Sequence, residues 1–295
     1  MGILHRPVLL KEVIKFFRPK SNENFIDCTL GGGGHAYEIL KRTSPQGKLL
    51  AIDLDKKALQ LSRERLKEFS DRIILVQDNF VNLKKIVNEQ IPNLPISGIL
   101  FDLGLSLDQI KTGWLGFSFS QEAELDMRLS GKGLKAEEII NQWSENELSS
   151  IFRRYGEEKL SREIAQEICQ QRKRKKIKST KELANLIIKV YQKKGKRRGK
   201  IHPATKVFQA LRIVVNQELE NLKKAIPQAV ELLKPKGRII VISFHSLEDR
   251  IVKNFFLDNQ DKLKIITKKP VRPSEEEIEI NIRARSAKMR VAEKI

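Results

Sequence analysis

The sequence contains few cysteines and no long hydrophobic run. Its two cysteines, Cys28 and Cys169, do not form a Cys-x-x-Cys pair, which excludes a disulfide framework and a zinc ribbon. We expect a reducing compartment and no metal site. No apolar run reaches the ~18–20 residues of a membrane span, and charged residues interrupt any signal-peptide core near the N-terminus. We therefore expect a cytoplasmic protein that does not cross a membrane.

Acidic residues are scarce relative to basic ones. The 295-residue chain has 37 Asp and Glu but 57 Lys and Arg, which gives a formal net charge of +20. Such a charge attracts phosphate groups or anionic membranes, so it indicates the class of partner and not the fold. Hydrophobic residues make up 40% of the chain, enough for a core, and the length predicts one large domain or two of medium size.

Short apolar runs alternate with segments of helical spacing in the first third of the chain, and further apolar runs follow near its end. This alternation predicts βαβ units and a parallel sheet of about seven strands, which is a Rossmann-like α/β fold. The expected strands are residues 25–29, 49–53, 73–77, 98–103, 238–244, 264–268 and 287–292.

The interval between the fourth and fifth expected strands is too long for a single crossover connection. One helix over residues 204–226, kinked or ended by Pro227, accounts for the last part of this interval. We therefore expect a sheet domain made of residues 1–104 and 202–295, interrupted by an inserted substrate-recognition domain of residues 105–201.

The expected insert carries helix signals. Ser144 with Glu147, and Ser179 with Glu182, have the spacing of capping boxes, and each pair precedes a segment with helical periodicity. The inserted domain should therefore be small and mainly helical.

A glycine-rich stretch joins the first expected strand to the first helix. It runs from Gly31 to Gly34, follows Asp27 and matches the pattern G-x-G-x-x-A, so the backbone can approach a ligand at a helix N-terminus. Asp53 ends the second strand, where a carboxylate accepts hydrogen bonds from the hydroxyl groups of an adenosine ribose. By itself, this pattern suits NAD as well as S-adenosylmethionine.

The charge of Asp27 separates these two cofactors. A dinucleotide would place a pyrophosphate near this carboxylate, an unfavourable pair of like charges, whereas S-adenosylmethionine brings a sulfonium and an ammonium group. We therefore expect S-adenosylmethionine, bound at Asp27, Gly31, Gly33, Gly34 and Asp53. The alternative is that Asp27 only caps the amides of the loop.

Two further residues lie at expected strand ends. Phe80 follows the third strand, where adenine would lie, although it could equally be a core residue. Asp102 leaves the fourth strand at the carboxyl edge, where open parallel sheets bind their ligands. Its carboxylate could receive a substrate amine, and the alternative is an ordinary turn residue at a strand end.

A series of short motifs extends along nearly the whole chain. They are His5-Arg6-Pro7-Val8-Leu9-Leu10, Gly33-Gly34-His35, Asp102-Leu103-Gly104, Gly116-Phe117-Ser118-Phe119, Leu125-Asp126-Met127-Arg128, Tyr155-Gly156-Glu157-Glu158, His202-Pro203-Ala204-Thr205, Phe208-Gln209-Ala210-Leu211-Arg212, Ser243-Phe244-His245-Ser246-Leu247-Glu248-Asp249-Arg250 and Arg285-Ser286-Ala287-Lys288. Together these motifs resemble the bacterial ribosomal RNA small subunit methyltransferase H family.

The resemblance implies a class I methyltransferase fold and a specific reaction. It implies methylation, dependent on S-adenosylmethionine, of the exocyclic N4 of a cytidine in the decoding region of small-subunit (16S) ribosomal RNA. The expected partner is thus this RNA within a ribosomal subunit. Carried over by motif, the cofactor contacts fall on Gly33, Gly34, His35, Asp53, Phe80, Asp102 and Gln109.

The residues also restrict the chemistry. Methylation of carbon 5 of a pyrimidine needs a cysteine thiolate, usually presented after a proline, and neither cysteine is so placed. Direct transfer to nitrogen needs a group that orients the amine and accepts a proton, for which Asp102 is our candidate. His245 is a second candidate base, but its place between a strand and a helix is also that of a helix cap.

Two segments are candidates for contact with RNA. Phe117 and Phe119 could sandwich a flipped base, or they could be core aromatics. Residues 172–200 contain fourteen Lys or Arg against one acid, Glu182. We expect phosphate contacts at Lys193, Lys194, Lys196, Arg197, Arg198 and Lys200, and the alternative is a solvated helix face.

Two other functions stay open on the sequence alone. One is an NAD-dependent oxidoreductase, and the other is a non-enzymatic RNA-binding assembly factor. Oligomeric state is not indicated by any of these patterns.

Overall fold

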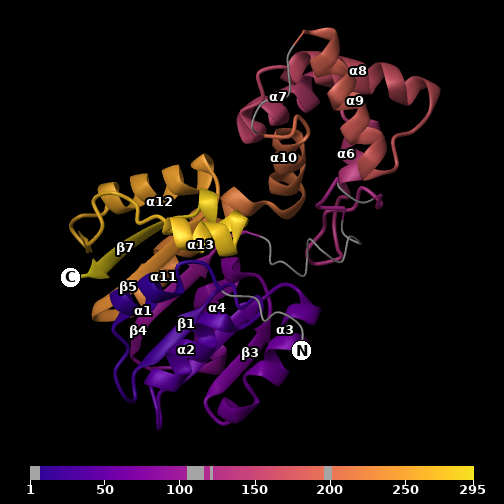
Figure 1. Ribbon diagram of the computed structural model, residues 1–295. Coiled ribbons are helices and arrows are strands. Elements are labelled where there is room, and N and C mark those ends of the chain that lie inside the picture. The colour runs from indigo at the N-terminus through magenta and orange to yellow at the C-terminus, as the bar shows by residue number, and fades with distance from the viewer. Residues whose placement is uncertain (1–6, 105–115, 120–121, 196–200) are drawn as a thin grey trace. The chain divides into compact units, whose positions relative to one another are not determined.

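Both ends of the chain contribute to one seven-stranded sheet in the computed structural model, which describes residues 7–104, 116–119, 122–195 and 201–295 (Figure 1). The described residues form two compact units. The first lies within Met1–Gly104 and Leu219–Ile295, and the second lies within Leu105–Glu218. In Figure 1 the first unit therefore combines indigo and magenta ribbons with orange and yellow ones.

The sheet has the strand order β3-β2-β1-β4-β5-β7-β6. Its strands are β1 (Asn24–Asp27), β2 (Leu49–Asp53), β3 (Ile73–Gln77), β4 (Ile96–Asp102), β5 (Leu233–Ser243), β6 (Leu263–Ile265) and β7 (Lys288–Lys294). The first five strands pair in parallel, whereas β7 pairs antiparallel with both β5 and β6. The predicted α/β class with about seven strands is confirmed, and the antiparallel pairs at one side make the sheet mixed.

Helices cover both faces of this sheet. The helices of the first unit are α1 (Leu10–Phe17), α2 (Gly34–Arg42), α3 (Lys56–Arg65), α4 (Leu83–Gln90), α11 (Glu218–Leu232), α12 (Ser246–Asp258) and α13 (Glu275–Ile280), with short 3₁₀ turns η1 (Lys67–Phe69), η2 (Phe80–Asn82) and η3 (Ile282–Ser286). One apolar cluster packs α1, α2 and α3 on the sheet, and another packs α4, α11 and α12 on it.

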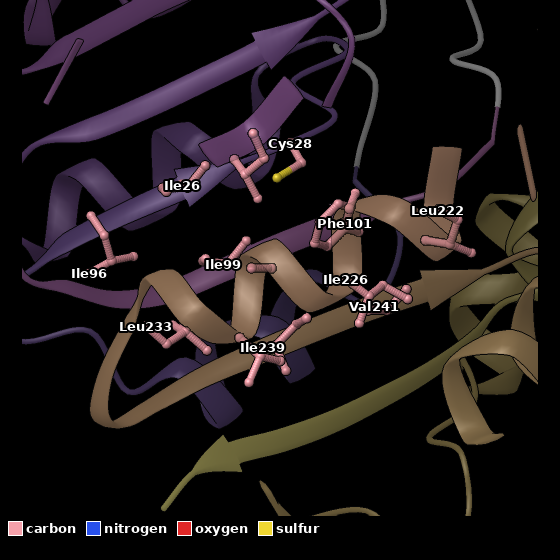
Figure 2. Close-up of a cluster of buried hydrophobic side chains, with 14 of the residues drawn as sticks. Ile26, Cys28, Ile96, Ile99, Phe101, Leu222, Ile226, Leu233, Ile239 and Val241 are labelled. Carbon is pink, nitrogen blue, oxygen red and sulfur yellow. The ribbon is translucent and has the colours of Figure 1, made fainter. Parts of the chain in front are cut away.

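Alternation along the central strands explains these two clusters. On β4, Ile99 and Phe101 belong to the cluster with α4 and α11, while Leu100 between them belongs to the cluster with α1 and α2. Successive side chains of a strand point to opposite faces, so a strand that is apolar throughout is buried on both faces. Figure 2 shows residues of the cluster with α4, α11 and α12, where Phe101 lies with Ile226 of α11 and Val241 of β5.

The second unit is helical. It contains α6 (Ala136–Gln142), α7 (Glu145–Gly156), α8 (Ser161–Arg174), α9 (Thr180–Lys193) and α10 (Thr205–Asn216), which share one buried apolar cluster. The capping boxes predicted at Ser144 and Ser179 are both confirmed, since each hydroxyl accepts a hydrogen bond from the backbone of the glutamate three residues later.

The prediction of a single helix over residues 204–226 was wrong. The structure has two helices, α10 and α11, because Gln217 between them has a left-handed backbone (φ 51°) that ends α10. The side chain of Asn216 adds to this ending, since it donates to the Met127 carbonyl and accepts from the Leu129 amide. Pro227, expected to kink or end the helix, lies inside α11.

The position of α10 bears on the extent of the helical unit. Val207, Phe208 and Leu211 of α10 are buried in the apolar cluster of the helical unit, and α10 contacts α7 and α6, so α10 belongs with the second unit. That unit therefore extends to Glu218, beyond the boundary at 201 and 202 that the sequence suggested. None of the described helices is both long and apolar enough to cross a membrane.

Candidate functional site

The glycine-rich loop after β1 depends on residues without side chains. Gly31 (φ 50°) and Gly33 (φ 70°) both have left-handed backbones, which residues with a side chain rarely adopt. A Cβ atom on Gly33 would also lie 3.2 Å from Ser62 Oγ and from Leu66 Cδ1. The loop therefore needs glycine for its conformation and for its close packing on the end of α3.

Two side chains of α3 donate hydrogen bonds to the loop. Ser62 Oγ donates to the Gly31 carbonyl at 2.6 Å, and the guanidinium of Arg65 donates to the Gly32 carbonyl at 3.0 Å. With these two carbonyl groups paired, the loop has a fixed shape. Ser62 and Arg65 were not predicted from the sequence, in which their spacing of three residues on one helix face is the only signal.

Asp53, at the end of β2, joins the second strand to the same loop. Its Oδ2 accepts a hydrogen bond from the Gly31 amide (2.8 Å), and its Oδ1 accepts one from the Asp55 amide (2.8 Å). Burial raises the pKa of this carboxyl to about 6, and the two amide hydrogen bonds oppose that rise. Asp53 thus both shapes the loop and brings a negative charge beside it.

Asp27 ends β1 and is 1% exposed. Burial raises its pKa to about 7; His35 and the Thr29 amide lower it, and the charges of Asp102 and Asp53 raise it. Its Oδ1 accepts a hydrogen bond from the Thr29 amide (3.1 Å), so it does cap a loop amide, as the alternative interpretation held. The same side chain is also a buried titratable charge.

Asp102 lies at the end of β4, the strand next to β1. Its backbone amide donates to Thr29 Oγ at 2.6 Å, which connects the ends of the two strands. One carboxylate oxygen, Oδ2, lies 3.5 Å from Nε2 of His35 in the first turn of α2. The other oxygen, Oδ1, is buried without a hydrogen-bond partner among the described residues.

Three carboxylates therefore meet at the carboxyl edge of the sheet. They come from adjacent strands in the order β2-β1-β4, and the glycine loop and His35 lie beside them. Such an edge has the electrostatic character to bind a cation.

The remaining residues of the predicted cofactor site fall in different places. Phe80 lies in η2 after β3 and packs edge-on against Phe101, with ring centroids 5.6 Å apart. Gln109 lies outside the described residues.

His245 has the geometry of a helix cap. Its Nδ1 accepts a hydrogen bond from the Glu248 amide (3.4 Å), and its Nε2 lies 3.2 Å from Glu248 Oε1. Oε2 of the same glutamate accepts from the Phe244 amide at 2.8 Å. This reciprocal pairing at the start of α12 is the alternative that the sequence offered for His245.

The two candidate stacking residues lie in the helical unit. Phe119 stacks on the ring of His202, with centroids 4.2 Å apart, and meets Phe208 edge-on at 5.2 Å. Phe117 also packs against the core of this unit and is partly buried. Part of the aromatic surface of Phe119 is therefore already in contact with protein.

The candidate phosphate contacts are divided between described and undescribed residues. Lys193 Nζ pairs with Glu167 at 2.8 Å, and Lys194 Nζ pairs with Glu163 at 3.1 Å, so the last residue of α9 and the residue directly after it are both in ion pairs with α8. The other four, Lys196, Arg197, Arg198 and Lys200, lie outside the described residues.

Several motif residues of the helical unit have packing roles that sequence reasoning did not assign. Asp126 accepts hydrogen bonds from the backbone and the guanidinium of Arg128. Buried Glu158 accepts from the hydroxyl of Tyr191 (2.7 Å) and from the Leu160 amide. These contacts are typical of residues that maintain a fold rather than bind a ligand.

We predict that Asp27→Asn stabilises the ligand-free protein at pH 8 but changes it little at pH 5. A raised carboxyl pKa means that folding disfavours the ionised form, so this group lowers stability as pH rises from about 4 to about 7. The cost at pH 8 is on the order of a few kcal/mol, at about 1.4 kcal/mol for each unit of pKa. Urea unfolding at both pH values measures it. Asp55→Asn is the control, because asparagine caps α3 as well as aspartate does. Equal effects of Asp27→Asn at the two pH values would contradict the prediction.

Comparison with known proteins adds an independent line of evidence. A model of the MraW methylase family matches residues 2–295. Proteins named ribosomal RNA small subunit methyltransferase H are similar over almost their full length. The one from Brevibacillus brevis is 45% identical, covering 99% of this chain and 98% of the relative, and the one from a Sulfurihydrogenibium species is 48% identical, covering 99% of both.

A solved structure, an rRNA methylase from Streptococcus thermophilus, has 12% sequence identity and a TM-score of 0.48, and the match covers 100% of this chain and 99% of that one. The match of the family model along residues 2–295, together with relatives at this level of identity, shows that the chain belongs to the MraW methylase family.

Proposed function

We propose that the chain transfers a methyl group from S-adenosylmethionine to the exocyclic N4 of a cytidine in the decoding region of small-subunit ribosomal RNA. The observation that carries this proposal is the meeting of Asp27, Asp53 and Asp102 beside the glycine loop, in a chain that belongs to a methylase family. The relatives named ribosomal RNA small subunit methyltransferase H support RNA of the small subunit as the substrate.

The residues at the sheet edge fit this cofactor. Buried Asp27 and partly buried Asp53 bring negative charge, which favours a sulfonium and an ammonium group over the pyrophosphate of a dinucleotide. The loop from Gly31 to Gly34 presents backbone to the ligand, and Asp102 Oδ1 is a buried polar atom that has no hydrogen-bond partner within the described part of the chain. We assign cofactor contacts to these residues and to His35, Phe80 and Gln109.

Asp102 has the position to act on the target amine. When bound, S-adenosylmethionine supplies a methyl group activated by the positive charge on its sulfur. The amino lone pair of cytosine is delocalised into the ring, so the protein must hold the amine in line with that methyl group and accept a proton. Asp102 can do both, because its backbone is fixed by Thr29 and its Oδ1 has no partner among the described residues.

The cysteines support transfer to nitrogen rather than to carbon. Burial, and then the charge of Asp27, raise the pKa of Cys28 well above its usual value, which disfavours the thiolate that addition to a pyrimidine ring needs. Cys169 lies on α8 in the helical unit, which has no glycine loop of this kind among its described residues.

Mass spectrometry of methylated RNA tests the proposed reaction. The protein is incubated with S-adenosylmethionine and small subunits from cells that lack it, and we expect one N4-methylcytidine in the decoding region. Asp102→Asn should lower the single-turnover rate at saturating cofactor by roughly 100-fold or more, because the proton acceptor is lost. Salt-sensitive RNA binding without methyl transfer would indicate an assembly factor instead. Stabilisation by NAD but not by S-adenosylmethionine would indicate an oxidoreductase.

We also predict that Asp53→Ala weakens binding of S-adenosylmethionine roughly 10- to 100-fold. Loss of a charged hydrogen-bond partner costs about 1.5–3 kcal/mol, and the Gly31 amide loses its acceptor as well. Titration calorimetry measures the affinity. Asp55→Asn, two residues further on, is the matched control and should bind normally. Unchanged affinity of Asp53→Ala would remove Asp53 from the pocket.

We propose that the inserted helical unit recognises the RNA and that the protein acts on a ribosomal subunit in the cytoplasm. Its basic segment, residues 172–200, supplies phosphate contacts, and Phe117 and Phe119 contact the target base. The ion pairs of Lys193 and Lys194 predict that the basic side chains of this segment contribute unequally to RNA binding. Lys193 and Lys194 must leave Glu167 and Glu163 before they can bind phosphate, so the cations after them should contribute more.

This ranking predicts the salt dependence of RNA binding. Each phosphate contact on single-stranded RNA adds about −0.7 to the slope of log affinity against log salt concentration. Replacing Lys196, Arg197, Arg198 and Lys200 by Gln should flatten this slope more per residue than replacing the paired Lys193 and Lys194. Cofactor affinity, measured on the same variants, should stay the same. An unaltered slope in both variants would place the RNA elsewhere.

A further inference from the structure

The side chain of His35 is buried at the candidate site and, within the part of the chain that the structure describes, lacks the hydrogen bonds that a buried imidazole normally makes. His35 is 4% exposed, and neither ring nitrogen has a hydrogen-bond partner among the described residues. A buried polar atom that lacks a partner costs about 1–3 kcal/mol, so an apolar residue would fill this place at lower cost. Packing alone therefore does not explain why a histidine occupies position 35.

The polar group that faces His35 is the carboxylate of Asp102. Nε2 of the ring lies 3.5 Å from Asp102 Oδ2, slightly longer than a normal hydrogen bond. The backbones on both sides are fixed, because Asp102 N donates to Thr29 Oγ and His35 lies in the first turn of α2, directly after the glycine loop. A shift of a few tenths of an ångström would bring this distance into the normal range of a hydrogen bond.

The strands that pack against α2 carry acidic side chains near His35. Asp27 on β1 and Asp102 on β4 interact with each other and with His35 electrostatically, and Asp53 on β2 acts on Asp27. From α3, Arg65 donates to the Gly32 carbonyl next to the first turn of α2. An N–H group of His35 directed at Asp102 is therefore in a favourable field.

The two oxygens of Asp102 are thus in different situations. Oδ2 faces His35, while Oδ1 is buried and lacks a partner among the described residues. A carboxylate that is held through one oxygen presents the other in a fixed direction. A catalytic carboxylate needs a fixed orientation, because a displacement of about 1 Å at a reacting group can lower the rate roughly 100-fold.

We propose that His35 is a positioning residue that acts through Asp102, and this rests on the function proposed above. Its Nε2–H donates to Asp102 Oδ2, which orients Oδ1 toward the target amine. As N4 forms its bond to the methyl carbon, the electron pair of the broken sulfur–carbon bond stays on sulfur. N4 keeps the pair of its N–H bond, and the proton passes to Asp102 Oδ1.

Two substitutions of equal length separate this role from packing. His35→Gln keeps an N–H donor near the place of Nε2, whereas His35→Met fills similar volume without a donor. We expect His35→Met to lower the single-turnover rate roughly 100-fold with saturating cofactor and RNA, while His35→Gln stays within a few-fold of the native rate. The KM for RNA should stay close to the native value, because the loss affects the orientation of Asp102 and not the binding of RNA.

A double-mutant cycle with Asp102→Asn tests whether His35 acts through that carboxylate. Adding His35→Met to Asp102→Asn should cause little further loss, since the group that His35 positions is already absent. Multiplying losses would overturn the proposal, as would a native rate for His35→Met or equal losses for Gln and Met. If His35→Met does not fold, His35→Asn replaces it, because its shorter side chain places the donor near Nδ1 and away from Asp102.

The native protein is assayed first, which separates the two proposals. Absence of N4-methylcytidine in that assay would refute the proposed function. A native protein that forms N4-methylcytidine, together with His35 variants at the native rate, would refute only the positioning role of His35.

Discussion

The burial of negative charge at one edge of the sheet is the constraint on which the rest of the site depends. Ionised carboxylates are costly to bury unless they accept hydrogen bonds or face a cation. Asp27 and Asp53 obtain part of this compensation from backbone amides of the loop and of the turn after β2. Because the Gly31 amide must point at Asp53, the loop must turn sharply, and its left-handed glycines allow that turn.

A second layer of contacts keeps the loop in place. Ser62 and Arg65 of α3 bond to two carbonyl groups of the loop, and Thr29 joins the ends of β1 and β4. The Gly31 amide thus faces Asp53, while the Gly31 and Gly32 carbonyls face α3. This division gives the site a fixed arrangement of charge before any ligand arrives, which is the property that effective catalytic sites share.

The sequence predicted features that depend on local patterns. The α/β class, the capping boxes at Ser144 and Ser179 and membership of the methylase family were predicted correctly, because periodicity, cap spacing and motif order are properties of the chain itself. The cofactor and RNA residues stay predictions, which the experiments above address.

Features that depend on long-range packing were not predicted. The break between α10 and α11 is stabilised by Asn216, whose partners Met127 and Leu129 are almost ninety residues away in the chain. Ser62 and Arg65 carry no motif, and their role exists only once α3 packs under the loop. The facing of His35 and Asp102, 67 positions apart, likewise arises from the fold.

The pairing of β4 with β5 has a consequence for synthesis of the protein on the ribosome. All residues of β4 before Asp102 are buried, yet its parallel neighbour β5 begins at Leu233, after the whole helical unit. At about 5–20 residues per second, roughly 7 to 26 seconds pass between the emergence of the two strands. During that time β4 is an apolar edge strand, the kind of surface that pairs with other chains. The nascent chain therefore exposes this edge of β4 until β5 has been synthesised.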